Sequence, residues 1–434
     1  MQTYDLIQKT RRLEPLSEGE IRHLVQGFTH GEIPDYMMSA WLMAVCCQGL
    51  SVEETVALTL AMRDSGDCLD LSSIHAKTID KHSTGGIGDK TTLLVAPIVA
   101  ACGGFVPKMS GRGLGFTGGT IDKLESIPNF RTDLSVEQFL DNTKKIGCCV
   151  IAQSGNLTPA DKKMYALRNL TATVDSIPLI CASIMSKKLA LGADCILLDV
   201  KYGSGAFMKT PEDAETLAKL MVQVGQQAGK SCRAIITDMN APLGAAVGNA
   251  LEVEEVILTL RGEIRNALTD LATALAAQML VMAGKGDIVL CRKMAEQALE
   301  SGEALEKFRA MIEAQGGDGN VCDDTDLLPK SEVKRTVFAS RRGFVTSIQS
   351  EEVGLACLGL GAGRTSDRPD IDMGAGVVFH RFVGDFVGQG DPLFTVHGKT
   401  DALCEAAISR LSAAIEIKDA PAVQIPMIHK IIEA

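Results

Sequence analysis

Two glycine-rich loops, each between a short apolar run and a helix-like segment, most constrain the fold of this chain. The first loop, residues 80–89, contains a lysine, a histidine, neighbouring serine and threonine hydroxyls and three glycines. The second loop, residues 108–120, contains a lysine, an arginine, a serine, two threonines and five glycines. Glycine lets backbone N–H groups approach an oxyanion closely, and lysine and hydroxyl side chains complete the cradle. The two loops therefore predict two walls of one anion site.

Strand-like and helical segments alternate over the part of the chain that holds these loops. Short apolar runs predict strands at residues 77–81, 105–110, 148–153, 195–200 and 233–238. Helical segments separate them, and this alternation is typical of an α/β layer with a mainly parallel sheet. We therefore expect a large α/β phosphate-binding domain made of residues 77–155 and 193–334.

Residues 1–66 are expected to form helices only. Ser17 and Ser51 each precede a glutamate by three positions, a capping-box pattern that marks the start of a helix. Two later helical segments lie between predicted strands and are expected to pack against the N-terminal helices. Together these segments predict a small, discontinuous, all-helical domain of residues 1–66 and 158–192.

The end of the chain has a different pattern, with short β-like pieces separated by glycine turns. These pieces lie at residues 343–345, 374–378 and 384–391. Residues 335–434 are therefore expected to form a glycine-rich, β-containing C-terminal α+β module that supports the rest of the molecule.

The composition argues against several broad classes of protein. The formal net charge of the 434 residues is −11, which disfavours a nucleic-acid-binding protein. The thirteen cysteines include adjacent pairs in apolar runs and no CxxC spacing, which favours reduced thiols in a cytoplasmic protein. No signal-peptide pattern and no apolar run of about 18 residues is present, so neither secretion nor a membrane partner is expected.

Both loops partly match known nucleotide-binding motifs. Lys90 and Thr91 end the first loop like a triphosphate-binding loop, but Asp89 stands where GxxxxGK[ST] requires glycine. A carboxylate at that position opposes a triphosphate, which argues against a kinase or ATPase. Residues 113–118 read GxGxxG, but Glu137 does not follow a convincing second strand, which argues against a dehydrogenase.

His82 is the most distinctive titratable residue of the first loop. It stands between Lys81 and Ser83 at the mouth of the loop, a position that is difficult to bury in an apolar core. A histidine there can donate a proton or a hydrogen bond near neutral pH, so we predict a functional role for it.

Several longer motifs resemble the thymidine and pyrimidine-nucleoside phosphorylases. The most specific is SGRGL at residues 110–114, followed by two free positions and by TGGTIDKLE at residues 117–125. Further matching motifs lie at residues 81–86, 165–168, 171–178, 182–188 and 203–208. The resemblance extends through the whole chain and is strongest to the bacterial pyrimidine-nucleoside phosphorylases.

This resemblance implies both an architecture and a reaction. The expected fold has its site in the cleft between the helical and α/β domains, forms a homodimer through the helical domain and closes at a hinge. The expected reaction, in pyrimidine salvage, is reversible phosphorolysis of uridine, thymidine or deoxyuridine to the free base and α-D-(2-deoxy)ribose 1-phosphate. The implied partners are inorganic phosphate and a pyrimidine nucleoside, with no organic cofactor.

The resemblance also implies roles for individual residues in the phosphate site. These residues come from both loops and from the helix that follows the first: Lys81, Ser83, Thr92, Lys108, Met109, Ser110 and Thr120.

A second group of residues is implied on the side of the base. Arg168, Ser183 and Lys187 would hold the pyrimidine edge, where cationic donors stabilise negative charge on the leaving base. The implied catalytic residues are His82, Arg168 and Lys187, with His82 facing the base carbonyl near the sugar. The residues that resemble walls of the base pocket are Leu114, Tyr165 and Phe207.

Some members of this family carry a structural potassium ion. The matching positions are Gly88, Lys90, Leu243, Ala246 and Glu255. Backbone carbonyls with one carboxylate suit a hard cation. Because position 90 is a lysine, its carbonyl can still bind the ion, or its ammonium can take the place of the ion beside Glu255.

Phe116 departs from the family pattern, in which a histidine is expected at this free position of the motif. The loss of this polar group leaves the preference for sugar and base open. A thymidine phosphorylase restricted to 2′-deoxynucleosides is one alternative. An anthranilate-type phosphoribosyltransferase, which would need a metal–pyrophosphate site, and a non-catalytic nucleoside-binding protein are two others.

Overall fold

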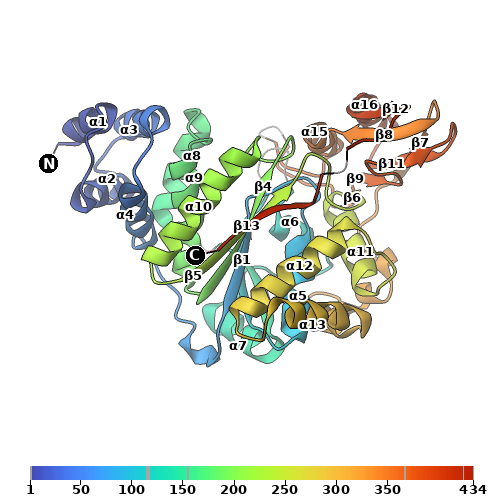
Figure 1. Cartoon of the computed structure of the whole chain (residues 1–434), viewed down its shortest axis with the longest axis horizontal. Helices are drawn as coiled ribbons and strands as arrows, with labels where there is room; N and C mark the ends of the chain where they lie inside the picture. Colours follow the sequence, from blue (N-terminus) through green and yellow to red (C-terminus); the bar gives the residue numbers. More distant parts are fainter. Residues whose placement is uncertain (1, 114–117, 154–155, 366–367, 424, 434) are drawn as a thin grey trace.

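The computed structural model describes residues 2–113, 118–153, 156–365, 368–423 and 425–433. Three regions follow one another along the longest axis of the molecule (Figure 1). N-terminal helices lie at one end, an α/β region in the middle and a β-rich module at the other end. Leu114 and Phe116, which the sequence analysis singled out, lie outside the described residues.

The N-terminal helices are joined by two helices from later in the chain. The first group is α1 Thr3–Arg11, α2 Glu18–His30, α3 Asp35–Gln48 and α4 Val52–Arg63, and the later pair is α8 Pro159–Leu170 and α9 Ile177–Leu191. Both predicted capping boxes, at Ser17 and Ser51, are confirmed. Met164 of α8 packs in the same apolar core as Trp41, whose indole N–H donates to Thr10 Oγ1 at 3.1 Å.

The α/β region is built on a central sheet with the strand order β1-β4-β5-β13. Its strands are β1 Ile79–Ser83, β4 Cys195–Tyr202, β5 Ser231–Asp238 and β13 Ile428–Ile432. The first three are parallel, as predicted, whereas β13 runs antiparallel to β5. A second parallel pair, β2 Val106–Ser110 and β3 Cys148–Ala152, adjoins β1 through a bridge between Thr78 and Phe105.

The sequence analysis assigned residues 428–432 to the C-terminal module, but in the structure they form β13 of the central sheet. Ile428 pairs with Thr237 and Ile432 pairs with Ala234, so the end of the chain adds an edge strand to the central sheet. Ile432 packs beside the apolar residues on one side of that sheet, and Ile428 packs on the other. These contacts explain why this short run leaves the C-terminal module.

Helices cover both faces of the central sheet. Their bounds are α5 Thr91–Ala101, α6 Thr120–Leu124, α7 Val136–Ile146, α10 Pro211–Gln227, α11 Asn249–Leu260, α12 Ala267–Met282, α13 Ile288–Glu300 and α14 Glu303–Ala314, with short 3-10 turns η1 Ser72–Ile74, η2 Gly319–Cys322 and η3 Thr325–Leu327. On β4, Leu197 faces the cluster that includes α5 and α12, whereas Ile196 and Leu198 face α10. The carboxyl ends of β1 and β2 lie at one edge, so both glycine loops open there.

The C-terminal module contains two small antiparallel sheets and a pair of packed helices. The sheets have the orders β6-β9-β11-β7 and β10-β8-β12. The bounds are β6 Ala246–Val247, β7 Val333–Phe338, β8 Gly343–Ile348, β9 Gly376–Phe379, β10 Phe386–Val387, β11 Pro392–Gly398, β12 Ile415–Lys418, α15 Ser350–Leu360 and α16 Asp401–Ala414. Because β6 precedes α11 in the chain, its pairing with β9 joins the module to the α/β region. Among the described residues, no helix combines the length and apolar character needed to cross a membrane.

Candidate active site

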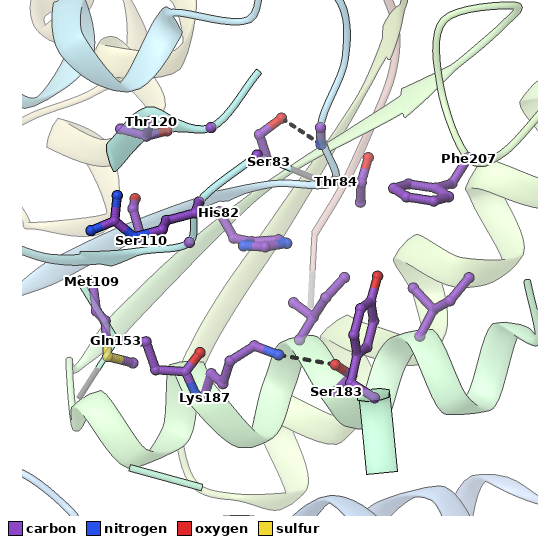
Figure 2. A pocket seen from close by; sticks show the side chains of 18 of the residues that line it. His82, Ser83, Thr84, Met109, Ser110, Thr120, Gln153, Ser183, Lys187 and Phe207 are labelled. Carbon is purple, nitrogen blue, oxygen red and sulfur yellow. Dashed lines mark hydrogen bonds between the residues drawn. The ribbon is translucent and has the colours of Figure 1, made fainter. Parts of the chain in front are cut away.

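A cavity of about 660 Å³ opens between the two glycine loops and helices α8 and α9. The loops that follow β1 and β2 and the start of α6 form one wall, and α8 and α9 form the other. Figure 2 shows His82, Ser110 and Thr120 on the loop side and Lys187 and Ser183 on the helix side. The cavity therefore brings together side chains from segments far apart in the sequence.

The first loop presents hydroxyl groups to the cavity at the carboxyl end of β1. Ser83 and Thr84 both line the cavity. The Ser83 hydroxyl donates to the Asp89 carboxylate and accepts from the Gly85 backbone N–H at 3.2 Å. Gly85 has φ +91°, in the left-handed region that favours glycine. Asp89, whose carboxylate argued against a triphosphate-binding loop, thus holds the Ser83 hydroxyl in place.

Lys81 does not line the cavity, in contrast to its predicted contact with phosphate. Its side chain is buried, and its ammonium donates to Thr91 Oγ1 and lies 3.2 Å from Asp199 on the neighbouring strand. Lys201 lies 2.8 Å from the same Asp199 carboxylate. Burial alone would raise the pKa of Asp89, but Lys81 and Lys201 hold that pKa well below its usual value. Lys81 therefore keeps the carboxylate behind the loop ionised.

The second loop brings a lysine and further hydroxyls to the cavity. The predicted phosphate-site residues that line it are Ser83, Thr92, Lys108, Met109, Ser110 and Thr120. The Lys108 ammonium donates to the Met109 carbonyl at 2.9 Å and lies 3.8 Å from Asp80. Lys188 also lines the cavity and lies 2.9 Å from Asp80.

Two buried lysines therefore share the carboxylate of Asp80 beneath the second loop. Burial and then the charge of Lys188 lower the pKa of Lys108 well below its usual value. An anion bound at the loops would supply negative charge and raise the pKa of Lys108 again. The family resemblance implied no role for Lys188, although it stands in the matching motif beside Lys187.

His82 faces the cavity with an imidazole that is neutral around pH 7. Its Nε2 atom is enclosed and has no hydrogen-bond partner within the part of the chain that the structure describes. Burial, followed by the charges of Lys188 and Lys108, lowers the pKa of His82 well below its usual value. A neutral imidazole donates a hydrogen bond through one nitrogen only, so the predicted role as a proton donor narrows to that of a hydrogen-bonding group.

The helix side of the cavity is organised around Lys187. Its ammonium donates to Ser183 Oγ at 2.9 Å, one turn earlier on α9, and to the carboxylate of Asp161 on α8. Tyr165 and Phe207, the predicted walls of a base pocket, also line the cavity. Asp161 was missed by the sequence analysis because nothing in its local sequence indicates the partner on another helix.

Arg168 is turned away from the cavity, which differs from its predicted contact with a base. Its guanidinium is buried and donates to the Thr173 carbonyl at 3.0 Å, the Leu179 carbonyl at 3.0 Å and the Val174 carbonyl at 2.7 Å. These carbonyls belong to the turn between α8 and α9 and to the start of α9. Three of the guanidinium N–H groups donate to these carbonyls. Arg168 therefore fixes the segment that carries Val174 into the cavity wall.

The five residues predicted to bind potassium come together behind the first loop, outside the cavity. The Lys90 ammonium lies 2.6 Å from the Ala246 carbonyl oxygen and 2.6 Å from Glu255 Oε2. A potassium ion would need these same oxygen atoms, so this residue set does not fit the ion while the ammonium is present. Within the described part of the chain, no group of three or more His, Cys, Asp or Glu side chains could hold a metal ion.

Three family models match successive parts of the chain. The glycosyl transferase family, helical bundle domain, matches residues 4–66, and the glycosyl transferase family, a/b domain, matches residues 75–305. The pyrimidine nucleoside phosphorylase C-terminal domain matches residues 344–418.

Full-length relatives carry one common name. The pyrimidine-nucleoside phosphorylase of Staphylococcus haemolyticus (strain JCSC1435) is 49% identical over 433 residues, and that of Staphylococcus aureus (strain bovine RF122 / ET3-1) is 48% identical. Both alignments cover 100% of each chain. Anthranilate phosphoribosyltransferase from Thermus thermophilus aligns with a TM-score of 0.59 at 19% identity, over 72% of this chain and 99% of its own. This last similarity shows a shared fold.

Proposed function

This chain belongs to the pyrimidine-nucleoside phosphorylase family, and we propose that it accepts uridine, thymidine and 2′-deoxyuridine as substrates. It is a pentosyltransferase that catalyses the phosphorolysis of pyrimidine nucleosides, with inorganic phosphate as the second substrate. One observation supports the placement of both substrates in the cavity. Loops rich in hydroxyls and N–H groups face the Lys187–Ser183 pair across a single space.

The reaction needs these two walls because it forms one bond and breaks another at the same carbon. A phosphate oxygen attacks C1′ of the sugar while the glycosidic C1′–N1 bond breaks and its electron pair moves to the base. The sugar gains positive character and the base gains negative charge as this happens. Phosphate on the loop side and pyrimidine on the helix side would place C1′ between them, in the geometry that a direct displacement requires.

Charged and polar donors on the helix side would stabilise the departing base. The Lys187 ammonium can donate to a carbonyl oxygen of the pyrimidine, where negative charge develops. The neutral His82 can donate a second hydrogen bond from the loop side. A proton from solvent or from Lys187 then completes the free base.

On the loop side, phosphate would interact with hydroxyls that the protein has already oriented. Ser83 is held by Asp89, and Ser110 ends β2 at the start of the second loop. Lys108 and Lys188, which share Asp80, supply positive charge beneath the bound anion. This arrangement favours a small dianion over a triphosphate, because the Asp89 carboxylate in the cavity lining would repel the larger negative charge.

The direct test is release of uracil or thymine from the three nucleosides, with and without phosphate and with and without EDTA. We expect phosphate-dependent release from all three and no effect of EDTA. Absence of phosphate-dependent release from every nucleoside would refute the assignment. Release from the 2′-deoxynucleosides alone would restrict the range to that of a thymidine phosphorylase, and dependence on a divalent metal would favour a phosphoribosyltransferase.

We further propose that the protein is a cytoplasmic homodimer formed through α1 and α3. These helices pack together and expose large apolar side chains, namely Tyr4, Tyr36 and Met43. All thirteen cysteines are free thiols, which is consistent with a reducing compartment. Light scattering during size-exclusion chromatography should give a dimer for the wild type and a monomer for Tyr4→Glu/Tyr36→Glu. A monomeric wild type would refute the proposal.

A further inference from the structure

Lys90 lies in an environment that is built for a monovalent cation. Its side chain is fully buried, and the ammonium contacts the Ala246 carbonyl and the Glu255 carboxylate. The backbone of Gly88 approaches the Leu243 carbonyl so closely that a Cβ at position 88 would lie 2.6 Å from that oxygen. Gly88 also has φ +71°, so glycine is needed for both reasons. Carbonyl and carboxylate oxygens thus converge where the ammonium lies.

The charge at this place is already balanced without any added ion. Glu255 accepts from the backbone N–H groups of Ala245 at 2.7 Å and Ala246 at 2.8 Å, from Asn266 Nδ2 at 3.3 Å, and from Lys90. Burial alone would raise the pKa of Glu255, but Lys90 and these hydrogen bonds hold it below its usual value. One buried carboxylate therefore faces one buried ammonium. A potassium ion added to this pair would leave one positive charge uncompensated in a buried site.

We propose that the ammonium of Lys90 takes the place of the structural potassium ion that some members of the family carry, and makes the stability and activity of this enzyme independent of potassium. The cation is part of the polypeptide, so it cannot dissociate. This inference concerns the cluster around Glu255 and does not depend on which nucleosides the cavity accepts.

The position of Lys90 connects this cation to the phosphate side of the cavity. Lys90 directly follows Asp89, and the backbone carbonyl of Asp89 accepts from Lys123 Nζ at 2.7 Å. Lys123 in turn lies 2.7 Å from Glu252, which stands one turn before Glu255 on α11. Two buried lysines therefore anchor the Asp89–Lys90 peptide to the same face of α11. Lys90 is a positioning residue for the first loop, since it touches no part of the cavity itself.

The wild-type enzyme provides the first test. Its Tm and its rate of phosphorolysis are measured in KCl, NaCl and tetramethylammonium chloride at equal ionic strength. We expect the same Tm, within about 1 °C, and the same rate in all three salts. A saturable rise of Tm or rate that is specific to potassium would overturn the proposal.

Two substitutions of Lys90 provide a matched second test. Lys90→Ala removes the charge and opens space for an ion, whereas Lys90→Met removes the charge but keeps the length of the side chain. In tetramethylammonium chloride both variants should melt at least roughly 5 °C below the wild type, because Glu255 loses its buried partner. Potassium should recover much of the Tm of Lys90→Ala and little of that of Lys90→Met.

The outcomes of this second test separate the alternatives. Equal rescue of both variants, rescue of neither, or wild-type stability of Lys90→Ala without potassium would each overturn the proposal. Since Tm is read without substrate, a failure here is distinguishable from a failure of the proposed activity. The wild-type measurements remain decisive if neither variant folds.

Discussion

The carboxylate of Asp161 on α8 pairs with the ammonium of Lys187 on α9 at the wall of the cavity that faces the phosphate loops. Only 5% of the Asp161 side chain is exposed, and its second oxygen has no hydrogen-bond partner among the described residues. The pair joins two helices of the helical domain, so it can set the direction of the Lys187 ammonium before any nucleoside arrives. Asp161 is therefore a positioning residue for the Lys187 ammonium, which would bind the pyrimidine base.

Substituting Asp161→Asn should remove this ion pair while preserving the shape of the side chain. We expect kcat/KM for uridine to fall roughly tenfold or more, because the ammonium loses a charged partner that orients it. The KM for phosphate should stay within about twofold of the wild type, since the loop side is unchanged. Steady-state kinetics with each substrate varied in turn checks this. Asp141→Asn, at an exposed pair with Lys144, serves as the control and should change neither constant.

Removal of one hydroxyl from each wall should separate the two substrates kinetically. Ser110→Ala is expected to raise the KM for phosphate by roughly tenfold, because one donor to the anion is lost. Ser183→Ala should instead raise the KM for the nucleoside by a similar factor, because Lys187 loses its hydroxyl partner. The same effect of both variants on both substrates would contradict the division of the cavity into a phosphate wall and a base wall.

Arg168 should affect stability as much as turnover. Its guanidinium donates to three backbone carbonyls between α8 and the start of α9, so Arg168→Met removes three charge-assisted hydrogen bonds. The expected loss in the free energy of unfolding is about 3 kcal/mol or more. Arg168→Lys should recover little of it, because a single ammonium cannot reproduce the planar fork of donors. Chemical denaturation without substrate measures this loss. A normal stability combined with a raised nucleoside KM would show that Arg168 contacts the base instead.

The pH dependence of turnover should lack a contribution from His82 near neutrality. Burial and the neighbouring lysines lower the pKa of His82, so the imidazole gains a proton only at a pH well below its ordinary pKa of about 6.5. As the pH falls from about 7.5 to 6, kcat/KM should therefore change by the same factor in the wild type and in His82→Gln. The variant itself should lower kcat by at least roughly tenfold at every pH, through the lost hydrogen bond. An acid limb near pH 6.5 that is present only in the wild type would assign an ordinary pKa to His82.

Local sequence signals predicted the elements of the fold better than they predicted the contacts of the site. Ser17 and Ser51 begin helices because a capping box involves residues only three positions apart. The glycine loops follow β1 and β2 because strand, turn and helix signals occur there in direct succession. Both kinds of signal involve residues only a few positions apart, so they can be recognised from the sequence alone.

The contacts that differ from prediction depend on how separate elements of the fold are placed relative to one another. Lys81 turns beneath its loop because Asp199 lies on the next strand, more than a hundred positions away. Arg168 turns to carbonyls whose positions depend on how α9 docks. The pairing of Lys187 with Asp161 likewise needs two helices to be placed first. Motif resemblance located these side chains but not the directions in which they point.

The return of the chain to the central sheet changes how the C-terminal module is attached. Because β13 pairs with β5 after the chain has left that module, the module is an insertion held at both ends, not an appendage hanging from one. A chain ending at Lys418 would keep β12 but leave β5 as an open edge, and open edges recruit strands from other molecules. The last few residues therefore replace an edge of eight residues by an edge of five residues that carries Lys430, and a short edge with a lysine is less prone to self-association.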